Sequence, residues 1–287
     1  MLTPPCPRLG GLLRLGGACL LSLAAALPRG TALAQTEHRV GLGVGYSHHA
    51  VMDTAATSLA YDGHLAATSL TYQGENGRVV WTARLGAAFG HMQATGHAGR
   101  TIRFVSREVD GSLDSVSVPV RASTLTADAR VRVERMLPVG RVVLLAGGDV
   151  GFGLTNVQGF AAPGLMQMLS LAPSLGARVP LPNRQLVQVS ARTVLAAWVS
   201  RMPYDQTVSL PGQTPYQGLV ARGSGWRSLG HLQTLSIDAA YQRDFGARGT
   251  LRVNLALGYL HDDWPRSLRV IDTTAEVSLA LRIGGRS

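Results

Sequence analysis

The sequence of 287 residues contains no lysine, and its only two cysteines, Cys6 and Cys19, lie near the N-terminus. Beyond residue 34 there is no cysteine, so that part of the chain cannot form disulfide bonds and must be stabilised by hydrogen bonding and packing. It also lacks an apolar run long enough for a membrane-spanning helix. The mean hydropathy of +0.13 is nevertheless high for a chain with 15% charged residues.

The first 34 residues contain no acidic side chain and have the layout of a secretory signal peptide. Arg8 and Arg14 precede an apolar run from Leu15 to Leu27, and Ala32-Leu33-Ala34 supplies a small-residue cleavage site. We predict that residues 1–34 are a signal peptide. We expect residues 35–287 to form one exported domain, because no Pro/Ser-rich linker divides them.

Arginine gives the exported part a positive charge. Removing the three arginines of residues 1–34 leaves 24 of the 27 basic residues against 17 acidic ones, a net charge of +7. The arginines are dispersed and no nucleic-acid-binding motif is present, which argues against a nucleic-acid partner. Pairing inside a barrel and contact with anionic outer-membrane lipid account better for the charge.

Apolar and polar residues alternate with period two through most of the exported part, which is typical of strands with one apolar and one polar face. In residues 78–92, Val79 and Leu85 fall on one face, and Arg84 and Gly86 fall on the other. The alternation recurs in residues 118–134, 184–200, 230–245 and 250–262 and in the last segment before the C-terminus. In 184–200 it places Val189, Ala197 and Val199 on the apolar face. Repeated segments of this kind indicate transmembrane β-strands.

These segments predict an all-β fold, an antiparallel up-and-down transmembrane β-barrel of about ten strands, with eight or twelve as alternatives. The predicted strands are 38–48, 63–74, 78–92, 118–134, 140–155, 164–178, 184–200, 230–245, 250–262 and the segment ending at Ile283. Short turns at 75–77, 136–139, 179–183 and 246–249 alternate with longer loops at 50–62, 96–116, 157–163, 201–228 and 263–269. Because short turns face the periplasm in such barrels, both termini are expected there.

A soluble barrel, whose apolar face would turn inward, is the alternative fold. The polar face here is rich in Gly, Ser, Thr and single Arg or Asp residues, unlike the Lys/Glu surface of soluble domains. Aromatic residues also fall at two levels, as at two membrane interfaces: Tyr46, Phe89, Phe152, Trp198 and Tyr259 at the outer one, and Tyr72, Trp81, Tyr241 and Phe245 at the periplasmic one. Pro173 predicts a bulge, and residues 101–118 predict a further hairpin above the membrane.

The polar face would enclose a set of charged side chains of both signs. They are Arg84, Asp128, Arg130, Arg132, Glu134, Arg141, Asp149, Arg192, Asp238, Asp244, Arg252, Glu276 and Arg282. Such residues predict either a charged pore for ions or small solutes or a salt-bridged plug. We favour a largely filled interior, because ten strands are close to the size that side chains fill. Inward glycines such as Gly43 and Gly151 would give arginine side chains room to cross the lumen.

Histidines and arginines gather near the predicted outer rim. A metal site there would need compact ligand spacing, which only the adjacent His48 and His49 approach. We therefore predict no metal and no other cofactor, and expect the histidines to lie at the lipid interface. Arginines of the outer loops would contact anionic lipid or another protein; they are Arg100, Arg103, Arg107, Arg201, Arg222, Arg227, Arg266 and Arg269.

The leader, the alternating strands and the aromatic girdles resemble those of small bacterial outer-membrane β-barrel proteins. The resemblance implies an outer-membrane location and assembly by the barrel-assembly machinery. The chain ends in Arg286-Ser287, however, and lacks the terminal aromatic residue common in such proteins.

The strand number is also similar to that of the omptins, outer-membrane proteases with paired acidic residues and an Asp/His pair at the extracellular mouth. Asp110 and Asp114, and Asp205 with His231, lack the close spacings of that family. We therefore predict a non-enzymatic barrel, either structural or a narrow solute or ion conduit. An outer-membrane surface enzyme, a protease or a lipid-modifying enzyme, is the alternative.

Overall fold

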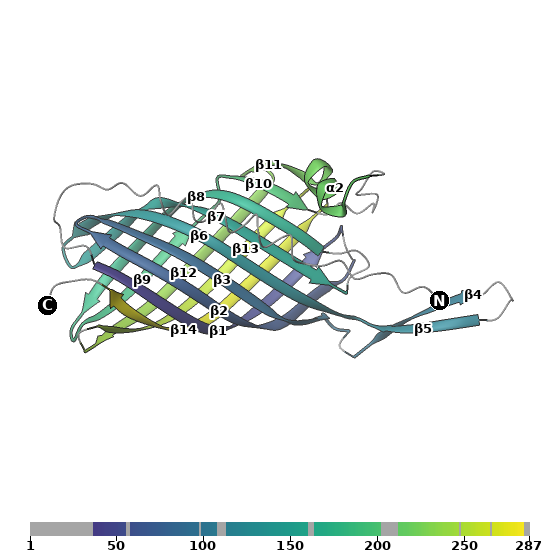
Figure 1. The fold of residues 1–287 in the computed structure, drawn as a ribbon, viewed down its shortest axis with the longest axis horizontal. Helices are drawn as coiled ribbons and strands as arrows, with labels where there is room; N and C mark the ends of the chain where they lie inside the picture. Colours follow the sequence, from purple (N-terminus) through teal and green to yellow (C-terminus); the bar gives the residue numbers. More distant parts are fainter. Residues whose placement is uncertain are drawn as a thin grey trace. The chain divides into compact units, whose positions relative to one another are not determined.

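The computed structural model describes residues 37–55, 58–97, 99–107, 113–159, 164–201, 212–246, 248–264 and 266–283. They form a closed antiparallel barrel of ten tilted strands (Figure 1). The barrel strands are β1 (Glu37–Asp53), β2 (Ala60–Asn76), β3 (Val79–Ala94), β6 (Arg121–Val139), β7 (Val142–Gln158), β8 (Gly164–Leu181), β9 (Gln185–Arg192), β12 (Leu232–Phe245), β13 (Gly249–Asp262) and β14 (Leu268–Ile283). The predicted signal peptide lies outside the described residues.

Each barrel strand pairs with the barrel strands before and after it in the chain, and β1 pairs with β14 to close the sheet. The closing register places His38 opposite Ile283 and Asp53 opposite Leu268. Closure gives each of the ten barrel strands two neighbours, so that none of them is an edge strand along its whole length. The prediction of an up-and-down barrel of ten strands is confirmed, and several strands are longer than the alternation indicated.

Very short turns join the strands at one end of the barrel, here named the short-turn end. Gly77-Arg78 joins β2 to β3, and Gly140-Arg141 joins β6 to β7. Gly77 and Gly140 have φ values of 57° and 61°, a left-handed conformation that glycine adopts without strain. The start of β1 and the end of β14 lie at the same end. The other end, named the long-loop end, carries the longer connections (Figure 1).

The two faces of the barrel differ as the alternation predicts. Outward positions carry apolar side chains that are well exposed, such as Val44 at 70% and Leu279 at 59%. Inward positions of the same strands carry polar and charged side chains, of which Ser47 and Glu276 are buried. This polarity is the reverse of that in a soluble barrel, so the soluble alternative is excluded.

Pro173 lies within β8, which is not interrupted. The bulge that Pro173 predicts lies instead in the strand that pairs with β8 on one side, between β9 and β10 (Ala196–Arg201). β9 ends at Arg192, and β10 continues in the same direction. The three residues between them oppose only Ala172 and Pro173 of β8, which makes a bulge of one extra residue. Proline suits this position because it cannot donate a ladder hydrogen bond.

The extra residue inverts the alternation beyond the bulge. Ala197 and Val199, predicted to face lipid, are buried inside the barrel. Trp198 points outward instead, and its ring centroid lies 5.7 Å from that of Trp226 on the paired strand. The prediction for Ala197 and Val199 is wrong because a strict period-two pattern takes no account of one inserted residue, beyond which every side chain changes face.

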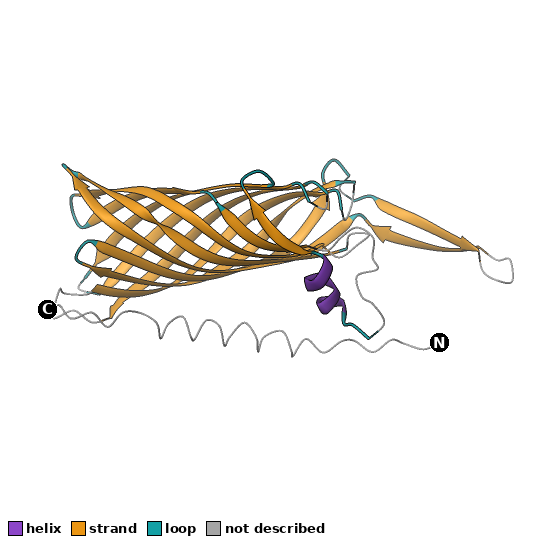
Figure 2. Ribbon diagram, turned by 90° about the horizontal axis from the view of Figure 1, so that it is seen from above, coloured by secondary structure: helices purple, strands orange, loops and turns teal. Residues whose placement is uncertain are grey.

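Further elements lie at the long-loop end (Figures 1 and 2). They are β4 (Thr101–Arg107) and β5 (Leu113–Pro119), β11 (Ser224–Ser228), which pairs with β10, and the helix α2 (Pro215–Arg222). β4 and β5 form the separate hairpin that the sequence predicts. The helix begins after Thr214, whose side chain accepts a hydrogen bond from the backbone N–H of Gln217. No helix within the described ranges is long and apolar enough to cross a membrane.

Single cysteines test the inverted alternation, because residues 35–287 contain no cysteine of their own. In the folded, detergent-solubilised protein we expect Trp198→Cys to react with an uncharged maleimide and Ala197→Cys to be protected, since Ala197 is fully buried. Val189→Cys, which faces outward before the bulge, is the positive control. Labelling is read by mass spectrometry, and faster labelling at position 197 than at 198 would contradict the bulge.

Candidate functional site in the barrel lumen

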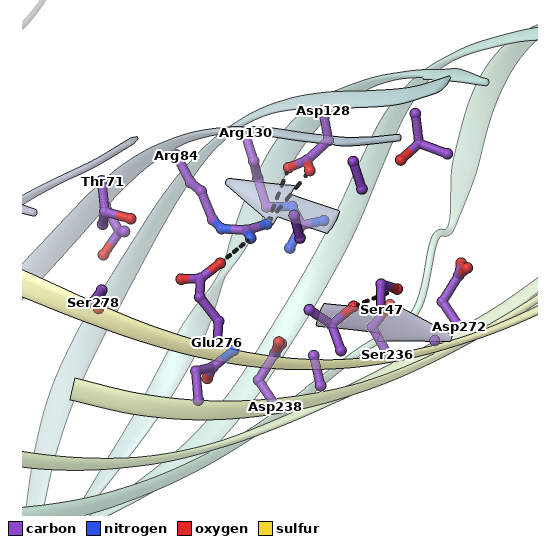
Figure 3. Close-up of a pocket in the computed structure, with 18 of the residues that line it drawn as sticks. Ser47, Thr71, Arg84, Asp128, Arg130, Ser236, Asp238, Asp272, Glu276 and Ser278 are labelled. Atoms are coloured by element: carbon purple, nitrogen blue, oxygen red, sulfur yellow. Dashed lines mark hydrogen bonds and ion pairs between the residues drawn. The ribbon is translucent and has the colours of Figure 1, made fainter. Parts of the chain in front are cut away.

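The inward faces of the strands enclose a cavity of about 400 Å³ (Figure 3). It reaches from Arg39 near the short-turn end to His49 and Leu260 toward the long-loop end. Its wall contains seven arginines, Arg39, Arg84, Arg130, Arg132, Arg178, Arg192 and Arg252, and five acidic residues, Asp128, Glu134, Asp238, Asp272 and Glu276. The wall therefore carries more positive than negative charge.

The structure gathers most of the predicted lumen residues around this cavity. Nine of them line it: Arg84, Asp128, Arg130, Arg132, Glu134, Arg192, Asp238, Arg252 and Glu276. Asp149 is buried beside the cavity, and Asp244 and Arg282 lie at the short-turn end. Arg141 does not belong to the lumen: the strands pair up to Val139 and Val142, so Arg141 falls in the exposed turn between them.

Arg84 on β3 joins two carboxylates across the middle of the cavity (Figure 3). Its Nη2 atom lies 3.0 Å from Oε2 of Glu276 on β14, and its Nη1 atom lies 3.3 Å from Oδ2 of Asp128 on β6. Gly43 makes room for the glutamate, because a Cβ atom there would approach Oε1 of Glu276 to 2.7 Å. An inward glycine thus creates space for a carboxylate here rather than for an arginine.

Asp149 on β7 organises a second group of ion pairs. Its buried carboxylate lies 3.4 Å from Nη1 of Arg192 and 3.7 Å from Nε of Arg132. Arg132 also lies 3.9 Å from Glu134 and 4.0 Å from Asp238. These side chains come from four strands, β6, β7, β9 and β12, so the ion pairs connect strands that are distant in sequence.

Partly exposed ion pairs span the short-turn end of the lumen. Arg39 lies 2.5 Å from Glu37 and 3.5 Å from Asp244. Arg282 reaches the same two carboxylates, at 2.9 Å and 3.6 Å. This end is therefore polar throughout, and water reaches its charged groups.

Apolar side chains fill the long-loop end of the lumen. One buried cluster consists of Val51, Tyr61, Met92, Ala94, Ala122, Val157 and Leu268, and a second consists of Ala172, Val194, Ala197, Val199 and Leu232. Met166 and Leu260 pack against both clusters and also line the cavity. We name the two clusters, together with Met166 and Leu260, the apolar seal. Sequence reasoning missed it because Val51 and Tyr61 were assigned to a loop, whereas β1 and β2 extend to include them.

Beyond the apolar seal, Arg201 is buried between two strand ends. Its guanidinium hydrogen bonds to Asp53 of β1, lies 3.4 Å from Asp262 of β13 and donates to two main-chain oxygens in the following loop. Arg227 of β11 lies 3.8 Å from Asp262 and stacks over the ring of Trp264 at 4.3 Å. The interpretation of Arg201 and Arg227 as surface arginines that contact lipid or another protein is therefore wrong. The inverted alternation turns Arg201 inward, and Arg227 lies opposite the inward-facing Ala197.

Histidines of the long-loop end are divided between the two faces. His49 points into the lumen and hydrogen bonds to Asp272, whereas His48 lies on the outer face with its ring centroid 5.2 Å from that of His64. His231 is exposed and its Nδ1 atom lies 3.0 Å from Oδ2 of Asp263. Among the residues that the structure describes, no group of three or more potential ligands is arranged to hold a metal ion. The omptin-like candidates Asp110 and Asp205 lie outside the described residues.

No protein-family model and no curated protein matches the sequence. The fold is similar to that of the outer-membrane protease OmpT from Escherichia coli, with a TM-score of 0.51, 8% identity and coverage of 89% of this chain and 99% of that chain. An outer-membrane channel from Pseudomonas putida F1 has a TM-score of 0.45, with 8% identity over 90% of this chain and 100% of that chain.

The translocator domain of the autotransporter NalP from Neisseria meningitidis has a TM-score of 0.39, with 9% identity over 95% of this chain and 96% of that chain. The three names describe a protease, a channel and a translocator. The likeness to OmpT supports a shared barrel fold, and a shared fold does not select a function.

Removal of one buried carboxylate tests the ion pairs of the lumen. We expect Asp149→Asn to lower the free energy of unfolding by about 3 kcal/mol, because it leaves Arg192 without its buried partner and removes one of the three carboxylates beside Arg132. Asp62→Asn, at a half-exposed position, is the control and should change it by less than about 0.5 kcal/mol. Urea unfolding in lipid vesicles, followed by tryptophan fluorescence, measures both. Equal losses in the two variants would contradict a structural role for the buried carboxylate.

Proposed function

We propose that this protein resides in a bacterial outer membrane as a closed, non-enzymatic β-barrel whose lumen does not form an open channel. The apolar seal is the observation that carries the proposal. A barrel that conducts ions or solutes needs a continuous polar path, and here buried side chains such as Met92 and Leu232 fill the long-loop end.

The outer face supports a membrane location. Exposed apolar side chains cover it, and aromatic pairs lie toward both ends: Tyr72 and Trp81, with centroids 4.7 Å apart, near the short-turn end, and Trp198 with Trp226 near the long-loop end. Aromatic residues at two levels match the two interfaces of a bilayer. The barrel fold shared with OmpT is consistent with this location.

The ends of the barrel favour one orientation. In outer-membrane barrels the short turns face the periplasm and the long loops face outward. With that orientation the ends of β1 and β14 are periplasmic, and the β4–β5 hairpin and α2 face the outside. The ion pairs of Arg201 and Arg227 would then hold the β10–β11 segment against the ends of β1 and β13 at the outer surface.

Planar-bilayer recordings test whether the lumen is closed. We expect no conductance steps from the refolded protein, because the apolar seal excludes water. Replacing Tyr61 and Met92 together by alanine should produce ion conductance, since both fill the seal. Phe89→Ala, which removes an exposed outward ring, is the matched control and should stay silent. Regular conductance steps from the unaltered protein would overturn the proposal of a closed barrel.

The surface-enzyme alternative is tested at the exposed His231–Asp263 pair, the type of pair that can act as a general base. We expect no hydrolysis of a mixed peptide library or of phospholipid vesicles, followed by mass spectrometry. Turnover that is lost in both His231→Ala and Asp263→Asn would instead favour the enzyme and contradict the non-enzymatic proposal.

A further inference from the structure

Two arginines that line the cavity, Arg130 on β6 and Arg252 on β13, differ from the other five. Arg39, Arg84, Arg132, Arg178 and Arg192 each have a carboxylate oxygen within 4.0 Å. Within the part of the chain that the structure describes, neither Arg130 nor Arg252 forms such an ion pair. The Nε atom of Arg130 is buried without a hydrogen-bond partner, as is that of Arg192, which forms an ion pair through Nη1.

Asp128, Asp149 and Asp238 attract Arg130, and Asp238 and Glu276 attract Arg252, but each of these carboxylates forms its ion pair with another arginine. Arg192 repels Arg130, and Arg252 is repelled by Arg132 and Arg178. Asp238 attracts both Arg130 and Arg252, but its ion pair, at 4.0 Å, is with Arg132. Of the seven arginines in the cavity wall, Arg130 and Arg252 are thus the two that form no ion pair with a described residue.

The inward face of β7 leaves free space two residues beyond Gly151, which lies opposite Arg130 in the register of β6 and β7. At Gly151 itself a Cβ atom would approach Oγ of Ser170 to 3.2 Å. A Cβ atom at Gly153, the next inward position of β7, would have no neighbour within 4 Å. Figure 3 shows Arg130 beside Arg84 among the residues that line the cavity. The site has room for a small molecule as well as an unbalanced charge.

Arg130 and Arg252 are partly buried. Guanidinium groups remain charged in proteins, and withdrawing an unpaired one from water costs free energy. An anion in the cavity would remove that cost, and carboxylate or phosphate oxygens match the planar guanidinium donors best. We propose that the cavity binds a small oxyanion, carrying a carboxylate or phosphate group, through Arg130 and Arg252.

The anion would enter from the short-turn end. The apolar seal blocks the other end, whereas Arg39, Asp244 and Arg282 at the short-turn end are partly exposed and form ion pairs that water can replace. Binding does not require a conducting barrel, so this site is independent of the proposed function. A conductance recording that showed an open pore would leave the site intact.

Isothermal titration of the refolded protein in a neutral detergent tests the site. Sodium succinate and sodium phosphate are the two probes, and sodium chloride keeps the ionic strength constant. We expect saturable binding of at least one probe. Arg130→Gln and Arg252→Gln should each weaken it about tenfold or more, because each removes charge-assisted hydrogen bonds. Arg141→Gln, in the exposed turn, is the matched control and should bind as the unaltered protein does.

A second kind of variant separates the loss of a ligand from a loss of folding. Gly153→Val keeps every charge and fills the free space, and valine suits a β-strand, so this variant should fold and yet bind more weakly. A heat-dependent shift in gel mobility confirms folding for each variant. No saturable binding of either probe to the unaltered protein, or equal affinity in Arg130→Gln, Arg252→Gln and the control, would overturn the proposal.

Discussion

A charged side chain that points into this barrel can find a partner only inside the barrel, because the outer face is apolar. The structure meets this constraint with ion pairs that join strands far apart in sequence, such as Arg84 with Glu276 and Asp149 with Arg192. Backbone pairing alone would fix each strand only to its neighbours. The interior charges add connections across the lumen, and they make the space between the strands narrow.

The two ends of the lumen differ in the polarity of their side chains. The short-turn end has exposed ion pairs, whereas the long-loop end is filled by apolar side chains and, beyond them, by the buried guanidinium of Arg201. Water can reach one end and is excluded from the other. That difference supports the proposals of a closed barrel and of an anion site that is reached from the short-turn end.

Much of the barrel could be predicted from the sequence, because one face must be apolar and the other polar along every strand. The alternation identified ten strands and most inward charges. It failed at Ala197 and Val199, where one inserted residue inverts the faces, and at Arg201, whose direction depends on the same insertion. The apolar seal was not predicted, because the alternation expects polar residues at inward positions along the whole length of a strand. Near the long-loop end, inward positions such as Met92 carry apolar residues instead. The ion pairs could not be assigned, since they depend on register between distant strands.

The central claim is that this chain folds into a membrane-embedded barrel with its polar face inside. Cell fractionation combined with gel electrophoresis of unheated and heated samples tests it most directly. The prediction is a protein in the outer-membrane fraction whose mobility changes on heating, because a closed barrel resists detergent until it is heated. A soluble protein with one mobility, heated or not, would contradict the claim.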